Sequence, residues 1–432
     1  MGYSILSSLF AWTMPIKKDR QDFRKVCKRA DNRNVTKIIK KRYEKIVAKL
    51  RAKSKIKVLF LVNENSKWKA QSLYDLMQST TDFEPIIGLT IADIQKKLPV
   101  SEKEIIIKQN QDFFEKKGMQ VVVTYDCKND RAIDLKNFDA DIVFYQQPYS
   151  IPKIQDIEIV SKFALTCYIP YYLPDYRNFD LDCDKEFHHN LFRFYVLNEE
   201  LESIYKKHLA QESIDTGNIK GLGHTMLDCI KTDTLPDNNP QVVIYAPHWS
   251  ICHEKNQNNI NISTFDTTGK SVLDYAKRHP EIQWIFKPHP TLKTALLRIG
   301  EKEEDINNYY QEWEKFATCC YDSKYLELFN KSTAMITDSG SFLLEYFCTG
   351  KPLIHLISQN CENVPYPQMQ DVFNTFYQVI NQRDLFGILD NLLVENNDQK
   401  MIQRIEILNK YKFNKNNAAQ NILNDLRKEL NK

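Results

Sequence analysis

Short runs of β-branched and aromatic residues alternate along the chain with longer stretches whose apolar residues recur at helical spacing. The first series of runs covers 56–62, 120–125, 141–146, 165–170 and 192–198, and the second covers 242–247, 283–288, 333–338 and 352–357. Strands separated by helical stretches are typical of parallel sheets with crossover helices. The pattern therefore predicts an α/β protein with two Rossmann-like domains.

A polar segment, TDTLPDNNPQ at 232–241, separates the two series of predicted strands. The chain has 432 residues, which is more than one hydrophobic core usually serves. We therefore expect an N-terminal domain over 55–232 and a C-terminal domain over 240–395. The remaining segment, 396–432, is charged and helical in pattern, so it is expected to form a helical tail on the surface.

The N-terminal region, 1–54, is predicted to form a basic helical arm. Residues 17–57 carry 18 Lys and Arg against 4 Asp and Glu, a net charge of +14, and the rest of the chain carries −11 because the total is +3. The apolar residues of the arm recur at helical spacing: Val35, Ile38, Ile39, Tyr43, Ile46, Val47 and Leu50. Such a helix can lie on an anionic membrane surface or dock on the body of the protein, and the sequence leaves both open. Nucleic acid is not expected as a partner, because the arm lacks a recognisable reader motif.

The sequence also bears on the compartment. No apolar run approaches the roughly 18 residues that a membrane-spanning helix requires. The first residues, MGYSILSSLFAWTMP, are followed rather than preceded by basic residues, so they do not resemble a secretory signal. The ten cysteines include no Cys-x-x-Cys pair, which fits a reducing compartment better than a disulfide framework or a zinc site. A cytoplasmic location is the prediction.

The stretch ITDSGSFLLEY at 336–346 joins a predicted strand to a predicted helix. Ser339, Gly340 and Ser341 form the turn, with Asp338 before it and Glu345 one helical turn after it. The first turn of a helix has unpaired N–H groups and a dipole that favours negative charge. A helix that begins at the carboxyl end of a strand is therefore a candidate phosphate site. The serine hydroxyls can donate to the phosphate, and Glu345 can accept from ribose hydroxyls.

Two further predicted strands end in histidine. His248 follows Ala-Pro after the strand at 242–247, and His289 follows Lys287 and Pro288 after the strand at 283–288. The carboxyl ends of parallel strands share one edge of a sheet, so we expect both histidines to lie near the segment that begins at Asp338. Each preceding proline fixes the direction of the chain and removes a backbone donor.

Three segments of the second series resemble the signature blocks of the CDP-glycerol glycerophosphotransferases, which build teichoic acids and related capsular polymers. They are VVIYAPHWS, QWIFKPHP and AMITDSGSFLLEYFCTGKPLIHL, within a resemblance that extends over roughly 160–360. The resemblance implies a GT-B fold, in which two Rossmann-like domains face a central cleft. It also implies that the C-terminal domain holds the nucleotide and that the acceptor approaches from the N-terminal domain.

The resemblance assigns roles to individual residues. His289 matches the family histidine that contacts the donor phosphates, Ser339 and Ser341 match the phosphate-binding hydroxyls, and Glu345 matches an acidic position near the ribose. The family usually has an arginine where this chain has Ser250, so one phosphate-neutralising cation is missing. Lys287 or His248 is expected to substitute for it.

The catalytic base is a second departure from the family pattern. Family members commonly carry a His-Gly element in the N-terminal domain, and the corresponding segment here, 167–172, contains no histidine. His188 and His189 follow downstream. His188 is a candidate base, although the two histidines also fit a surface pair on a helix.

The reaction that the resemblance implies is attack of an acceptor hydroxyl on the β-phosphorus of a CDP-linked polyol, with release of CMP. The acceptor would be lipid-linked or a saccharide, and the enzyme would lie at the inner face of the cell membrane through residues 17–57. No carboxylate cluster demands a metal, and Mg²⁺ on the pyrophosphate remains compatible with the sequence. Alternatives are a GT-B glycosyltransferase with a nucleotide-sugar donor, an epimerase of the same fold, and a non-catalytic nucleotide-binding paralogue.

Overall fold

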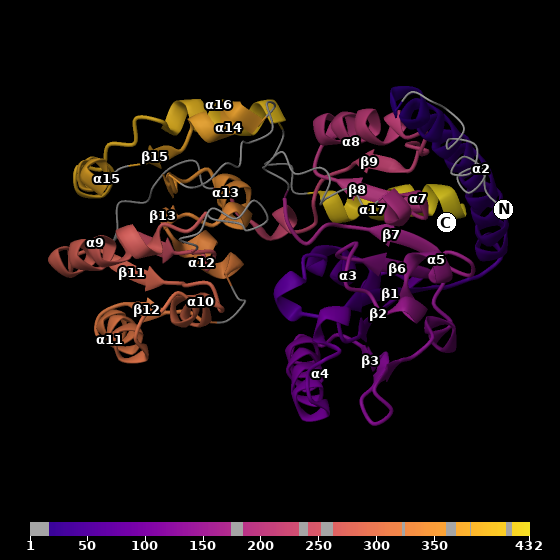
Figure 1. Ribbon diagram of the computed structural model, residues 1–432, viewed down its shortest axis with the longest axis horizontal. Helices are drawn as coiled ribbons and strands as arrows, with labels where there is room; N and C mark the ends of the chain where they lie inside the picture. Colours follow the sequence, from indigo (N-terminus) through magenta and orange to yellow (C-terminus); the bar gives the residue numbers. More distant parts are fainter. Residues whose placement is uncertain are drawn as a thin grey trace. The chain divides into compact units, whose positions relative to one another are not determined.

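The computed structural model of the protein describes residues 17–173, 185–232, 241–251, 262–321, 325–359, 369–380, 382–411 and 417–432. The chain divides into two compact units, which Figure 1 shows. Unit 1 comprises Met1–Tyr171, Asn178–Asp228 and Lys415–Lys432, and unit 2 comprises Tyr172–Arg177 and Cys229–Asn414. Most of the polar segment predicted to separate the domains, at 233–240, lies outside the described residues.

Unit 1 is built on a seven-stranded parallel sheet in the order β3-β2-β1-β6-β7-β8-β9. The strands are β1 Ile56–Val62, β2 Phe83–Leu89, β3 Val121–Val123, β6 Ile142–Tyr145, β7 Leu165–Tyr168, β8 Arg193–Val196 and β9 Ile219–Gly221, with a small hairpin of β4 Tyr125–Asp126 and β5 Arg131–Ala132. Its helices are α2 Lys17–Arg51, α3 Gln71–Gln78, α4 Val100–Glu115, α5 Ile157–Val160, α7 Lys185–His189, α8 Glu199–Gln211 and α17 Ala418–Leu430.

Unit 2 is built on a six-stranded parallel sheet in the order β12-β11-β10-β13-β14-β15. The strands are β10 Val242–Ala246, β11 Gln283–Phe286, β12 Thr318–Cys319, β13 Ala334–Thr337, β14 Leu353–Leu356 and β15 Tyr377–Val379. The helices are α9 Phe265–Arg278, α10 Leu292–Arg298, α11 Glu303–Glu314, α12 Leu326–Lys331, α13 Gly340–Phe347, α14 Gln370–Asn374, α15 Gln382–Leu389 and α16 Met401–Tyr411, with a π-helical turn at Asp390–Val394.

Both faces of the unit 2 sheet are covered, which is why its strands have no polar face. Alternate residues of β10, such as Val243 and Tyr245, join one core cluster with apolar residues of α9, α11 and α15. The intervening Ile244 points to the opposite face, because successive side chains of a strand alternate, and it is fully buried there too. A parallel sheet buried on both faces explains the nearly continuous apolar runs in the sequence.

The C-terminal segment does not form the surface tail that the sequence suggested. α16 belongs to unit 2, whereas α17 returns to unit 1 (Figure 1) and packs one face against its core. The apolar stripe of α17 is buried there: Ala419, Ile422, Leu423, Leu426 and Leu430. The carboxylate of Asp228 accepts hydrogen bonds from the first N–H groups of α17, those of Ala418 and Ala419, at 2.9 and 2.8 Å. The expectation of a single tail was wrong because α16 and α17 belong to different units, and the apolar stripe of α17 docks on unit 1 while the polar side of the helix stays exposed.

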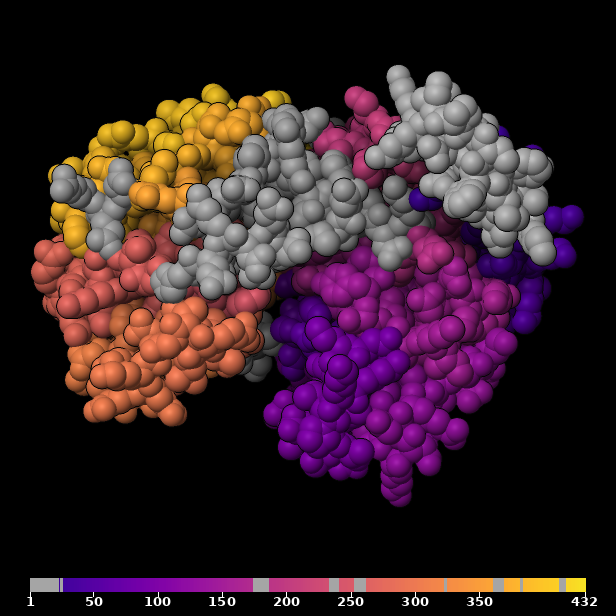
Figure 2. Space-filling view, in the orientation of Figure 1, coloured from indigo at the N-terminus to yellow at the C-terminus, as the bar shows by residue number. Residues whose placement is uncertain are grey.

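The basic arm is the helix α2, and its second half docks on unit 1. Ile39, Tyr43, Val47 and Leu50 are buried in the core of that unit, and the Tyr43 hydroxyl lies 2.7 Å from Oγ1 of Thr166 on β7. The docking alternative left open by the sequence is therefore confirmed for this half. The opposite side of the helix is exposed, and Figure 2 shows α2 in indigo at the surface of unit 1.

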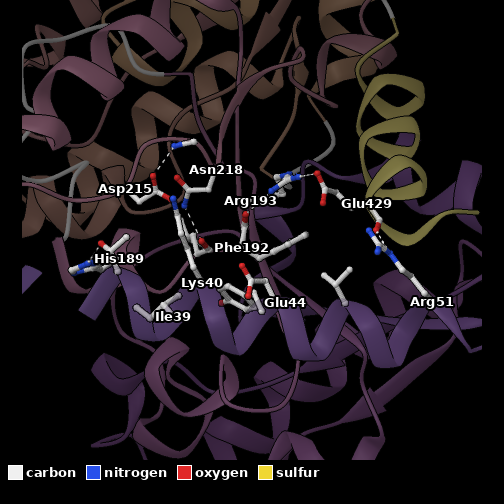
Figure 3. A pocket seen from close by; sticks show the side chains of 15 residues that line it. Ile39, Lys40, Glu44, Arg51, His189, Phe192, Arg193, Asp215, Asn218 and Glu429 are labelled. Carbon is white, nitrogen blue, oxygen red and sulfur yellow. Dashed lines mark hydrogen bonds and ion pairs between the residues drawn. The ribbon is translucent and has the colours of Figure 1, made fainter. Parts of the chain in front are cut away.

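A groove of about 430 Å³ runs between α2 and the segment around β8. Figure 3 shows Ile39 and Lys40 of α2 on one side and Phe192 and Arg193 on the other. Two cations at its rim are already paired: Lys40 with Asp215 at 3.0 Å, and Arg193 with acidic residues of α17. These two charges are therefore compensated by the protein itself and do not select an anionic ligand.

No helix in the described part of the chain combines the length and the apolar character needed to cross a membrane.

Candidate functional site

The carboxyl edge of the unit 2 sheet has a point where the strand order reverses. β11 and β12 lie on one side of β10, and β13, β14 and β15 lie on the other. In open α/β sheets, ligands bind outside the carboxyl ends of the two strands that flank such a switch point. His248 follows β10 and the segment from Asp338 to Ser341 follows β13, so both flank the switch point, and His289 follows the adjacent β11. The predicted convergence of these segments on one edge is thus confirmed by the topology.

The carboxylate of Asp338 connects the loops at this edge. It accepts hydrogen bonds from the backbone N–H groups of His248 and Thr264, both at 2.6 Å. The hydroxyls of Ser263 and Thr264 donate to it as well, both at 3.2 Å. Asp338 is only 1% exposed, and this burial raises its pKa to about 6 while the four donors oppose the rise. Asp338 therefore positions His248 and the start of α9, with its carboxylate occupied by the protein itself.

The two histidines of the edge lie side by side. The ring centroids of His248 and His289 are 5.3 Å apart, and Trp249 lies 5.6 and 6.1 Å from them. Burial lowers the pKa of His248 to about 3, with a further contribution from His289. Burial likewise lowers the pKa of His289 to about 4, with a further contribution from Lys287. Both imidazoles are therefore neutral at pH 7.

The hydrogen bonds of the two rings assign the same tautomer to both. The N–H of Ser250 donates to Nδ1 of His248 and the N–H of Thr291 donates to Nδ1 of His289, each at 3.2 Å. Because a backbone N–H can only donate, each Nδ1 accepts, and the proton of the neutral ring is on Nε2. Each ring thus has an Nε2–H donor. Ser250 thus orients His248 and supplies no cation.

The helix α13 begins directly at the switch point. Ser339 occupies its N-cap position, as predicted, but its side chain makes no capping hydrogen bond; its Oγ lies 3.2 Å from Oγ of Ser341. Ser341 is exposed, whereas Ser339 is 4% exposed. The N–H groups of the first turn lack intrahelical acceptors by the geometry of any α-helix. This combination of amides and hydroxyls is suited to an anionic oxygen group.

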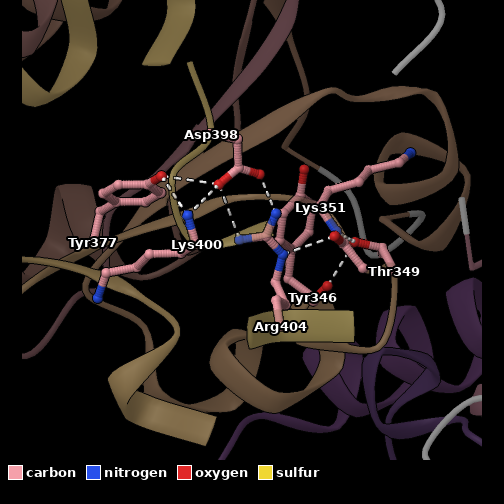
Figure 4. Close-up of polar contacts among 8 residues, drawn as sticks. Tyr346, Thr349, Lys351, Tyr377, Asp398, Lys400 and Arg404 are labelled. Carbon is pink, nitrogen blue, oxygen red and sulfur yellow. Dashed lines mark hydrogen bonds and ion pairs between the residues drawn. The ribbon is translucent and has the colours of Figure 1, made fainter. Parts of the chain in front are cut away.

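The other end of α13 is fixed by a buried guanidinium, which Figure 4 shows. Nε of Arg404 donates to the carbonyl oxygen of Gly350, just after the helix, at 2.7 Å. The same guanidinium pairs with Asp398, which also accepts from the Tyr377 hydroxyl at 2.8 Å. Arg404 is 1% exposed. A cation at the carbonyl end of α13 is favourable to the helix dipole and holds the helix in position.

Two residues that were predicted to bind the nucleotide donor are buried inside unit 2. Glu345 is 1% exposed, and its Oε2 accepts a hydrogen bond of 2.5 Å from the hydroxyl of Tyr325. Lys287 is 5% exposed, and its backbone N–H continues the pairing of β11 with β10 by donating to the carbonyl oxygen of Tyr245 at 2.9 Å. The contacts that we expect of them, with ribose and phosphate, stay predictions.

The sequence allowed His188 and His189 to form a surface pair, but His188 is buried. It belongs to unit 1, is 2% exposed, and packs among aromatic rings, with centroid distances of 5.0 Å to Phe194 and 6.1 Å to Tyr168. His189 contacts Oγ1 of Thr36 on α2 at 2.9 Å. The expectation was wrong because α2 and the aromatic side chains cover the helix α7. A role of His188 as base stays a prediction.

Sequence reasoning missed three residues that hold the site together: Ser263, Thr264 and Thr291. Ser263 and Thr264 precede α9, where hydroxyl residues usually cap their own helix. Here they donate to Asp338, a partner 74 or 75 residues away in sequence. The signal available in the sequence was the pair of hydroxyl residues before a helix, but it gave no indication of the distant carboxylate.

Among the described residues, no group of three or more His, Cys, Asp or Glu side chains is arranged to hold a metal ion.

Comparisons with known proteins identify the fold. No family model and no curated protein matches this chain in sequence. In structure, a variant of the wall teichoic acid polymerase TagF is 13% identical, with a TM-score of 0.56, over 99% of this chain and 98% of that chain. The chain has the GT-B fold.

Other GT-B proteins are similar to a comparable degree. MnaA from S. aureus in complex with UDP is 14% identical, with a TM-score of 0.53, over 87% of this chain and 97% of that chain. The UDP-GlcNAc 2-epimerase from Neisseria meningitidis bound to UDP-GlcNAc is 13% identical, with a TM-score of 0.52, over 86% of this chain and 100% of that chain. The predicted α/β class and two Rossmann-like domains are thus confirmed, and the predicted cleft stays a prediction.

The role of Asp338 generates a prediction. Asp338→Asn should lower the free energy of unfolding by roughly 3 kcal/mol, because the amide nitrogen would face N–H donors and bonds to a charged acceptor would be lost. Urea denaturation of the full chain measures this. Asp274→Asn, at an exposed position of α9, is the control and should change little. Equal stability of the two variants would contradict the role of Asp338.

Proposed function

We propose that the protein transfers a glycerol-phosphate, or a related polyol-phosphate, from a CDP-linked donor to an acceptor hydroxyl in the synthesis of a cell-surface polymer. The observation that carries the proposal is the juxtaposition of two Nε2–H imidazoles, those of His248 and His289, at the switch point where α13 begins. The sequence blocks that resemble the CDP-glycerol glycerophosphotransferases contain these same residues. The likeness to TagF over nearly the whole chain supports the proposal.

The reaction forms one bond and breaks one bond. The acceptor oxygen bonds to the β-phosphorus, the bond from that phosphorus to the bridging oxygen breaks, and CMP leaves with the bonding electrons. The acceptor proton passes to a base. Negative charge grows on the bridging oxygen and the α-phosphate, so donors fixed in a partly buried site stabilise the transition state more than water does.

The structure supports a role of both histidines as hydrogen-bond donors. In the tautomer that these hydrogen bonds assign, Nδ1 of each ring is occupied and Nε2 carries a proton, so the rings would donate to phosphate oxygens and would not take up the acceptor proton. The hydroxyls of Ser339 and Ser341 and the first amides of α13 would complete the cradle around the pyrophosphate. Neutral rings of lowered pKa would gain basicity once the anion is bound, because negative charge stabilises imidazolium.

A nucleotide-sugar donor is the second candidate. It is favoured by the similarity to proteins of the same fold whose structures contain UDP or UDP-GlcNAc. The nucleotide released separates the two: CMP indicates phosphodiester formation and UDP indicates sugar chemistry. A panel of CDP-glycerol, CDP-ribitol and common UDP-sugars therefore distinguishes the two proposals.

His289→Ala should reduce CMP release from CDP-glycerol by about 100-fold or more. One hydrogen-bond donor to the developing negative charge contributes roughly 3–4 kcal/mol to transition-state stabilisation. Turnover is measured with purified full-length protein and a membrane fraction as acceptor.

The control is His279→Ala. His279 precedes β11, at the opposite edge of the same sheet, so its loss should leave turnover within a few-fold of wild type. Near-full turnover by His289→Ala would show that the site is wrongly assigned.

We also propose that the exposed side of α2 binds an anionic membrane surface, which would place a cytoplasmic enzyme at the inner face of the membrane, close to a lipid-linked acceptor. Lys37, Lys41 and Lys45 are exposed at a spacing of four residues, on a helix whose apolar residues hold it to unit 1. Each lysine near an anionic surface contributes about 1 kcal/mol. The helix is thus anchored by one side and cationic on the other.

Replacing Lys37, Lys41 and Lys45 by glutamine should greatly weaken flotation with vesicles that contain phosphatidylglycerol, because about 3 kcal/mol of attraction is removed at low salt. Vesicles of phosphatidylcholine alone should float neither protein. A matched triple variant at the exposed Lys270, Lys277 and Lys302 of unit 2 should float like wild type. If both triple variants float equally, α2 is not the membrane contact.

A further inference from the structure

Unit 1 has a switch point of its own. In the order β3-β2-β1-β6-β7-β8-β9, the chain reverses direction across the sheet between β1 and β6. By the same rule that applies to unit 2, the carboxyl ends of β1 and β6 are where a ligand of unit 1 is expected. Lys67 lies in the turn shortly after β1, and Gln146, Gln147 and Tyr149 follow β6 directly.

The amide of Gln146 is an unexplained polar group at this place. Gln146 is 6% exposed, and neither its Oε1 nor its Nε2 has a hydrogen-bond partner among the described residues. Oε1 of the neighbouring Gln147, which is 5% exposed, also has none. Buried polar groups without partners are rare, because burial removes them from water without compensation. Two of them in succession at a switch point make this edge of the sheet a candidate ligand site.

Two tyrosines and a lysine border these amides. The N–H of Tyr171 donates to the carbonyl oxygen of Gln146 at 3.1 Å, and Nε2 of Gln147 donates to the carbonyl oxygen of Tyr149 at 2.7 Å. The hydroxyls of Tyr149 and Tyr171 are 2.6 Å apart. Nζ of Lys67 lies 5.9 and 5.5 Å from the centroids of their rings. Tyr149 is 45% exposed, so an aromatic side chain is accessible beside the amides.

We propose that this group, the Gln146 site, binds a neutral, polyhydroxylated ligand such as a saccharide or polyol. The unpaired atoms are one donor, Nε2 of Gln146, and two acceptors, the Oε1 atoms of Gln146 and Gln147. A hydroxyl both donates and accepts, so neighbouring hydroxyls satisfy all three atoms. A phosphate group without a proton only accepts, so it would leave both oxygens unpaired.

The surroundings favour the same class of ligand. The charge of Lys67 is compensated by Glu64, whose Oε1 lies 3.1 Å from Nζ, so the lysine does not select an anion. Aromatic side chains beside a few polar groups are typical of small-molecule sites, and they contact the apolar C–H faces of a sugar. A role of the Gln146 site in the reaction rests on the proposed transferase function. If that function holds, the Gln146 site binds the hydroxyl-bearing end of the acceptor. The acceptor would then present a neutral saccharide or polyol end to this site.

The test separates ligand binding from folding. Gln146→Leu keeps the approximate volume and removes the unpaired amide. It should therefore raise the Tm by about 2–4 °C and weaken saccharide binding at least tenfold. Saturation-transfer NMR of full-length protein with glucose, N-acetylglucosamine, glycerol and glycerol 3-phosphate measures binding without any nucleotide.

Gln155→Leu is the matched control. Gln155 is a fully buried glutamine of the same unit, but its side chain accepts from Thr90 and donates to the carbonyl oxygens of Thr124 and Ile133. This variant should lower the Tm. Tyr149→Ala, at an exposed position, tests binding independently and should weaken it at least fivefold.

Three results would overturn the proposal. They are a lower Tm for Gln146→Leu, unchanged saccharide binding by both Gln146→Leu and Tyr149→Ala, and binding of glycerol 3-phosphate without binding of any neutral compound. Because the binding measurements contain no nucleotide donor, these results do not depend on the reaction at unit 2. Conversely, a protein that binds saccharides but releases no CMP would retain the Gln146 site and lose the proposed function.

Discussion

The buried carboxylate of Asp338 connects three parts of the chain that are distant in sequence: the end of β13, the loop after β10 and the start of α9. A bond to a charged acceptor contributes about 1.5–3 kcal/mol, so four donors to one carboxylate fix these loops strongly. His248 is placed by this carboxylate, and its ring then meets His289. Beyond the far end of α13, Arg404 donates to the carbonyl oxygen of Gly350, just after the helix. The position of the helix start thus depends on two buried charges, one at each end.

The two units use the same topology for different chemistry. Each has a parallel sheet that reverses order, and each presents side chains at the carboxyl ends of the flanking strands. At this edge, unit 2 presents mainly hydrogen-bond donors, which suit an anion. They are the Nε2–H groups, the hydroxyls and the amides of α13. Unit 1 offers the mixed donors and acceptors of Gln146 and Gln147, which suit hydroxyls. This difference in hydrogen-bonding character fits the proposed transfer from a phosphate-containing donor to a hydroxyl acceptor.

The sequence predicted what local pattern and topology determine. The apolar runs predicted five of the seven strands in the unit 1 sheet and four of the six in the unit 2 sheet, and β1 has the predicted bounds. The strands β9, β12 and β15 were missed because each has only two or three residues, too few to show a pattern. β2 was missed because Pro85 and Gly88 interrupt its pattern, although Gly88 is needed where a Cβ would lie 2.8 Å from Leu59. The edge carrying His248, His289 and the segment from Asp338 was predictable because parallel strands share one direction. The return of α17 to unit 1, the burial of His188 and the four donors to Asp338 depend on contacts distant in sequence, which no local pattern reveals.

The central claim is that the imidazole of His289 faces the diphosphate of a cytidine nucleotide. NMR titration of the histidine rings of the full-length protein, without and with CDP, tests it most directly. The account predicts a pKa of about 4 for His289 in the free protein and a rise of about one unit or more with CDP, because the diphosphate stabilises imidazolium. His224, whose pKa burial in unit 1 lowers to about 4, should not respond to CDP. If CDP binds and the pKa of His289 does not change, the claim is contradicted.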